Sequence, residues 1–89
     1  MFKKLWNVMV YDVELASGNL IVLRKKREAG KTTYMLTSIF AGVKPQIKNT
    51  NGKFIKLSDV KPMDRATIDC RIQNGMLVAS KIIIGKYER

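Results

Sequence analysis

The sequence predicts an all-β fold, a small OB-like β-barrel of five to six strands in which residues 1–89 form a single domain. Turn-forming residues divide the chain into strand-length segments, one of which alternates strictly between apolar and polar side chains. No segment has the pattern of an amphipathic helix of three turns. A chain of 89 residues is too short to build a second layer, so the sheet is expected to curl on itself.

The clearest strands lie near the C-terminus. In Arg65–Gln73 every second side chain is apolar, which predicts a strand with one buried face and one solvated face. Asn74-Gly75 then supplies the two positive φ angles of a type I′ turn. Met76–Ile84 is therefore expected to return as the antiparallel partner.

Three earlier segments complete the predicted barrel. Lys4–Leu15 is strand-like, but its apolar residues change face, which indicates a bulge near Tyr11-Asp12. Asn19–Arg27 begins with an apolar run and ends in four cations. Lys31–Phe40 is rich in β-branched and aromatic residues, as strands are.

Turn signals separate these segments. They are Ser17 to Asn19, Gly30, Gly42 to Pro45, Asn51-Gly52, Pro62 and Asn74-Gly75. Lys53–Leu57 is expected to be a short apolar-alternating piece, and Ser58–Pro62 at most one helical turn. Whether residues 41–57 form a hairpin, a loop or a lid stays open.

A recurrent turn, strand and hairpin pattern is carried by Leu57–Pro62, Asp64-Arg65, Asn74-Gly75, Leu77–Ala79 and Lys81-Ile82. About a third of the chain in this way resembles OB-fold-like small β-barrel domains, with a weaker match at the first hairpin. The chain departs from the pattern at Met63, where glycine is usual. The resemblance implies an OB-like barrel, and nucleic acid bound to such a barrel usually crosses its second and third strands.

The charge of the chain is its most unusual property. It contains 17 Lys and Arg against 7 Asp and Glu, a net charge of +10, and no acid lies between Glu28 and Asp59. Because such a field attracts polyanions, we expect a nucleic-acid-binding protein of low sequence specificity, with single-stranded DNA or RNA favoured. The alternative is a protein–protein interaction module or a structural component of a phage, plasmid or secretion complex that docks an acidic protein partner.

Candidate nucleic-acid-binding residues follow from the basic cluster at the end of the second predicted strand. Tyr34, beside that cluster, is the best placed ring for stacking on a base. The candidates are Arg24, Lys25, Lys26, Arg27, Lys31, Tyr34, Lys53, Lys56 and Arg71. A solvated hairpin tip is the alternative interpretation of the cluster. The other aromatic candidates, Trp6, Tyr11, Phe40 and Phe54, are expected mainly in the core.

The composition argues against catalysis and bound metal. The chain has no His, and Cys70 is its only thiol, which removes His-assisted nucleophiles and Cys-clustered zinc sites. Ala29–Thr33 ends like a phosphate-binding loop but lacks the upstream glycine and the following helix. We therefore expect no enzyme activity, no cofactor and no metal, with Cys70 as a buried apolar residue. We also expect a cytoplasmic protein without a membrane span.

Overall fold

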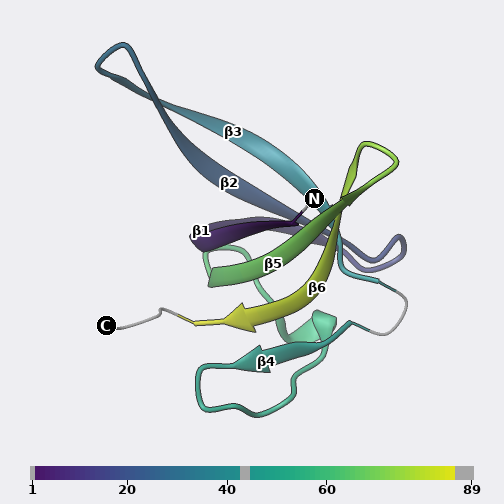
Figure 1. Ribbon diagram of the computed structural model, residues 1–89. Helices are drawn as coiled ribbons and strands as arrows, with labels where there is room; N and C mark the ends of the chain where they lie inside the picture. Colours follow the sequence, from purple (N-terminus) through teal and green to yellow (C-terminus); the bar gives the residue numbers. More distant parts are fainter. Residues whose placement is uncertain (1, 43–44, 86–89) are drawn as a thin grey trace.

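The strands of the protein form one curled sheet. The computed structural model describes residues 2–42 and 45–85. Its elements are β1 (Phe2–Glu14), β2 (Asn19–Glu28), β3 (Lys31–Phe40), β4 (Ile47–Asn49), the 3₁₀ turn η1 (Leu57–Asp59), β5 (Arg65–Gln73) and β6 (Met76–Ile84). The sheet order is β3-β2-β1-β5-β6-β4, and a further pairing of β3 with β6 closes five strands into a ring (Figure 1). The all-β prediction is confirmed. Within residues 2–42 and 45–85, no helix is long and apolar enough to cross a membrane.

β1 links the two halves of the barrel because it pairs with a different strand at each end. Residues 2–9 pair antiparallel with β5, and residues 9–14 pair antiparallel with β2. The register shifts between Val10 and Asp12, which confirms the predicted bulge. A bulge bends a strand and increases its twist, so β1 can follow the curvature of the closed sheet.

A second irregularity in β1 was not predicted. Its register with β5 shifts between Leu5 and Val8, and Asn7 there has a φ of 46°. The Asn7 amide donates to Thr67 Oγ1 at 3.2 Å, and Arg65 Nη1 donates to the Asn7 carbonyl at 3.3 Å. The irregular backbone is therefore compensated by side chains of β5, which explains why a threonine is tolerated in the core.

The barrel encloses one apolar core. Its fully buried members include Leu20 and Val22 of β2, Ile68 of β5 and Ile82 of β6. The predicted apolar face of β5 is buried from Ala66 to Cys70, but the alternation is broken at Thr67, which was expected in solvent and is buried. Ile72 was expected on the same buried face but is 42% exposed. The reason is that the β1–β5 pairing ends opposite residue 71, so the tip of the β5–β6 hairpin extends past the strand that would cover it.

The turn before β5 keeps its shape although methionine stands where the related pattern has glycine. Met63 has a φ of 77°, and its amide donates to the Val10 carbonyl at 2.8 Å. The same turn is held by the Lys61 amide, which donates to Asp64 Oδ2 at 2.9 Å. A non-glycine residue in this region of φ costs about 1–3 kcal/mol, so these contacts hold Met63 in a strained conformation.

Replacing this methionine by glycine is expected to stabilise the protein. Met63→Gly removes the backbone strain, and little packing is lost because the side chain is 76% exposed. Glycine also increases the entropy of the unfolded chain, which offsets about 0.5–1 kcal/mol of the gain. We expect a net increase of about 0.5–1 kcal/mol in the free energy of unfolding, measured by urea denaturation. Met63→Ala retains the positive φ and should give no increase, whereas destabilisation by glycine would contradict the strain.

Residues 45–57 add a short strand beside β6 and contribute Ile47 to the core. Ile47 is fully buried, and β4 pairs parallel with β6 over three residues. Lys53–Leu57 forms no strand, because only Phe54 makes an isolated bridge to Lys48. The strand lies before the Asn51-Gly52 turn instead, since the exposed Phe54 cannot anchor the core as Ile47 does. Residues 43 and 44 of the predicted Gly42 to Pro45 turn lie outside the described residues.

Candidate binding groove

A groove opens where β1 and β2 separate. Their ladder ends at the pair Met9 and Leu23, while β2 and β3 remain paired to the turn at Ala29-Gly30. This hairpin projects away from the barrel (Figure 1). The groove has a volume of about 530 Å³, and its charged and aromatic lining consists of Lys3, Lys4, Trp6, Arg24, Lys25, Tyr34 and Arg65. We call it the basic groove.

The alternation of β2 distributes its cations over both faces of the projecting hairpin. Leu20 and Val22 point into the core, so Arg24 and Lys26, of the same parity, continue the concave face. Lys25 and Arg27 lie on the convex face. Four consecutive cations therefore surround the β2 edge with positive charge on both sides.

The charges of two groove cations act on the Cys70 thiol. Burial raises the pKa of this thiol, and the charge of Asp69 raises it further, whereas the charges of Lys3 and Arg24 lower it. Lys3 comes from β1 opposite Cys70, and Arg24 comes from the diverging part of β2, so the groove joins cations from its two walls.

Few carboxylates neutralise this surface. Among the residues that the structure describes, Lys4 pairs with Asp69 at 3.5 Å and Lys26 with Glu28 at 2.8 Å. No carboxylate lies within pairing distance of Arg24, Lys25 or Arg27 in the described ranges. Two like charges 4 Å apart in water repel by only about 1 kcal/mol, so the fold tolerates the cluster while its field remains available to an anion.

Two exposed aromatic rings border the same groove. Trp6 of β1 is 52% exposed, and Tyr34 of β3 is 63% exposed. Lys4 Nζ lies 4.3 Å from the centroid of the Trp6 ring. The prediction that most aromatics lie in the core is wrong: Tyr11 and Phe54 are exposed as well, and Phe40 is half-buried. The core is filled by Leu, Ile and Val instead.

The structure brings only some of the predicted site residues together. Arg24, Lys25 and Tyr34 line the basic groove, and Lys26, Arg27 and Lys31 continue along the same hairpin. The other three lie elsewhere: Lys53 follows β4, Lys56 lines a different pocket, and Arg71 lies on β5 opposite Phe2.

Sequence reasoning missed the β1 wall of the groove. Lys3 and Lys4 of β1 and Arg65 of β5 line the groove but were not among the candidates, and Trp6, weighed as a stacking ring, was expected mainly in the core. A signal was present, since Lys4 and Trp6 are two residues apart in a strand and so share one face. What could not be read from the sequence is that this face lies beside the end of β2.

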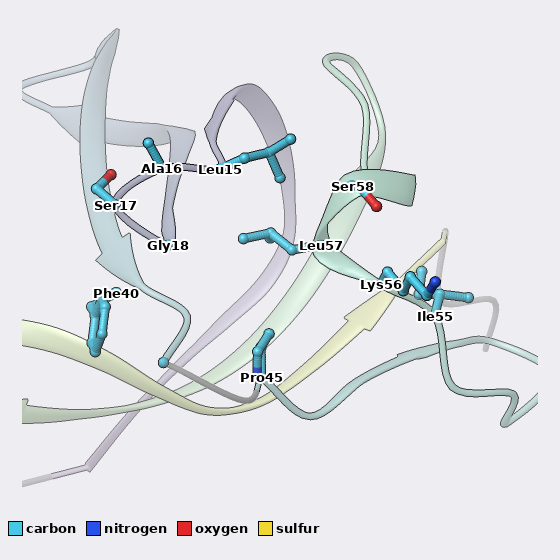
Figure 2. Close-up of a pocket in the computed structure, with 11 residues that line it drawn as sticks. Leu15, Ala16, Ser17, Gly18, Phe40, Pro45, Ile55, Lys56, Leu57 and Ser58 are labelled. Atoms are coloured by element: carbon cyan, nitrogen blue, oxygen red, sulfur yellow. The ribbon is translucent and has the colours of Figure 1, made fainter.

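A second pocket, of about 610 Å³, lies at the opposite end of β2. Figure 2 shows Leu15 to Gly18 of the β1–β2 turn, Phe40 at the end of β3 and the segment from Ile55 to Ser58 around it. Lys56 is the only charged residue in its described lining. The basic groove therefore combines several charges with exposed aromatic rings that a ligand could recognise, whereas this second pocket has a single charged residue in its described lining.

The comparisons with known proteins define the fold. No family model and no curated protein matches the sequence. One solved structure, the crystal structure of Ag(I)CusF, matches with a TM-score of 0.58 over 96% of this chain and 99% of that chain. The sequence identity is 15%, so the match shows the fold alone. The protein is a small OB-like β-barrel.

The prediction of a nucleic-acid-binding protein is contradicted by this comparison. The barrel that matches is described with silver(I), a cation, and not with nucleic acid. The physical reason for the error is that a basic surface on an OB-like barrel indicates an anionic ligand without specifying its class, and a fold hosts many functions.

Proposed function

We propose that the protein is a non-enzymatic docking module that binds an acidic, extended segment of a partner protein in the basic groove. The observation that carries the proposal is the lining itself: five cations and two exposed rings, with no Asp or Glu among the lining residues that the structure describes. Charge complementarity selects an acidic ligand and accelerates its encounter with the groove.

The aromatic rings support a protein ligand. Trp, Tyr and Arg are the residues that most often dominate the energetics of protein interfaces. Trp6, Tyr34 and Arg24 all line the groove, and the paired strands β2 and β3 continue beyond it to Glu28 and Lys31, which suits an extended chain. A segment that places carboxylates beside the cations and an apolar side chain against the rings would use the whole surface.

The silver(I) of CusF does not suggest a function for this chain. Soft monovalent cations are held by thiolate and thioether ligands. Cys70 is enclosed in the core, and Met9, Met35, Met63 and Met76 belong to different strands or turns. The described residues also contain no cluster of three or more His, Cys, Asp or Glu.

Binding of a labelled acidic peptide tests the proposal. We expect the fluorescein-labelled peptide GSDEDELSG to bind at 50 mM salt, by fluorescence anisotropy, and to weaken at least tenfold at 300 mM salt as charges are screened. Trp6 is the only tryptophan, so its emission should change on binding. The neutral peptide GSNQNQLSG is the control. Absence of binding at 50 mM salt, or equal binding of the neutral peptide, would overturn the proposal.

A further inference from the structure

We infer that the acidic segment binds by adding a strand to the open edge of β2. This inference rests on the proposed function and specifies how the groove holds its ligand. Strand addition uses backbone hydrogen bonds for affinity and side chains for selectivity. The argument depends on three features: the free backbone groups of β2, the charge on both its faces, and the length of its unpaired edge.

The first feature follows from the β2–β3 turn. Ala29 and Gly30 have φ values of 49° and 76°, which defines a two-residue type I′ turn. The residues that flank such a turn, Glu28 and Lys31, exchange backbone hydrogen bonds, and every second pair along the ladder does the same. Lys26 and Arg24 are therefore bonded to β3.

The residues between them face the other way. Lys25 and Arg27 direct their N–H and C=O groups toward the side where Leu23 pairs with Met9. No strand among the described residues pairs with β2 on that side beyond Leu23. These four backbone groups are two donors and two acceptors at the spacing that an added strand requires.

The edge also determines the sequence of the ligand. Cations lie on both faces of β2, Arg24 and Lys26 on one and Lys25 and Arg27 on the other, so acids on either face of the added strand meet a cation. A segment with consecutive acids is thus favoured over one with alternating acids. The open edge from Arg24 to Glu28 is about 16 Å long at 3.3 Å per residue, enough for about five residues.

The facing edge of β1 completes the site. Residues 3–5 pair with β5 on one side and line the groove on the other. Lys4 and Trp6 project from this wall, so the added strand would have a basic and aromatic neighbour opposite β2. The groove therefore resembles a sheet from which one strand is missing.

Amide hydrogen exchange, followed by NMR with and without saturating GSDEDELSG, tests the inference on the whole chain. In the free protein the amides of Lys25 and Arg27 should exchange at least tenfold faster than that of Lys26. With peptide, exchange at Lys25 and Arg27 should slow at least tenfold while Lys26 changes little. Peptide binding without this protection would overturn strand addition and leave the docking function standing; absence of binding would overturn both.

Backbone-modified peptides give an independent readout. Methylating the amide nitrogens at alternate positions of the acidic run blocks hydrogen bonding on one edge of the added strand and leaves its charge unchanged. Two such peptides can be made, one methylated at the odd and one at the even positions of the acidic run. We expect one of them to bind at least tenfold more weakly and the other to keep its affinity. If the two methylated peptides bind with equal affinity, the ligand has no defined strand register. The same conclusion would follow if a peptide with single serines between the four acids binds as tightly as GSDEDELSG.

Discussion

Arg24→Glu combined with Lys25→Glu should lower the affinity for GSDEDELSG at least about 100-fold at 50 mM salt. Each reversal removes a hydrogen bond between charged groups, worth about 1.5–3 kcal/mol, and replaces attraction by repulsion. Two such losses exceed the roughly 2.7 kcal/mol that correspond to 100-fold. Lys25 is exposed and Arg24 is half-buried, and the change relieves repulsion among neighbouring cations. The free energy of unfolding should therefore change by no more than about 1 kcal/mol, the typical effect of a single substitution.

The matched control is Lys53→Glu combined with Lys56→Glu. It makes the same change in net charge at exposed positions outside the basic groove. Fluorescence anisotropy should show less than about a fivefold loss of peptide affinity, since only the long-range field is altered. If the two double variants weaken binding equally, the peptide responds to net charge and not to the groove.

Ile68→Ala should produce the largest loss of stability of any single change considered. Ile68 is fully buried and lies between Leu5 of β1 and Ile82 of β6 in the sheet. Truncating a buried isoleucine to alanine costs about 2–5 kcal/mol, because apolar contacts are lost and a cavity remains. A chain of this length has a total stability of about 4–13 kcal/mol. The midpoint of thermal unfolding should therefore fall by at least about 10 °C.

Ile72→Ala is the internal comparison in the same strand. It removes the same atoms from a residue that is 42% exposed beyond the end of the β1–β5 ladder. Its effect on the free energy of unfolding, by urea denaturation, should be less than half that of Ile68→Ala. Equal effects would mean that the tip of the β5–β6 hairpin is packed as tightly as the centre of the barrel.

The fold was largely predictable because its strands satisfy local rules. Arg65–Gln73 and Lys31–Phe40 carry a strong alternation or β-rich composition between unambiguous turns, and both form strands with those bounds. β4 was missed because three residues give no periodicity, and Ile47 is placed by a parallel pairing with β6 that is distant in sequence. The local sequence pattern predicts a long strand, but it does not predict which edge of the sheet a short strand such as β4 will pair with.

The candidate site was only half predictable for a related reason. Arg24 to Arg27 form a run that stands out in any charge profile. The partner wall contributes Lys3, Trp6 and Arg65, whose proximity depends on the bulge at Asn7 and on the point where β1 and β2 separate. Neither feature has a sequence signature. The predicted class of ligand, nucleic acid, was wrong for a different reason. Net charge indicates the sign of the charge on a partner, but it does not indicate the partner's chemistry.

Because the β1–β2 ladder is interrupted, the free energy of unfolding is expected to depend on ligand concentration. β1 pairs with β2 only from Met9 onward, so part of the backbone of the β2 edge is without a partner strand in the described protein. A ligand that binds only the folded chain raises the free energy of unfolding by RT ln(1 + [L]/Kd), about 2.7 kcal/mol at a hundredfold excess over Kd. The projecting hairpin, which lies farthest from the core, would gain most from the added ladder. An acidic segment bound in the way proposed would therefore stabilise the folded chain as a further strand of the sheet.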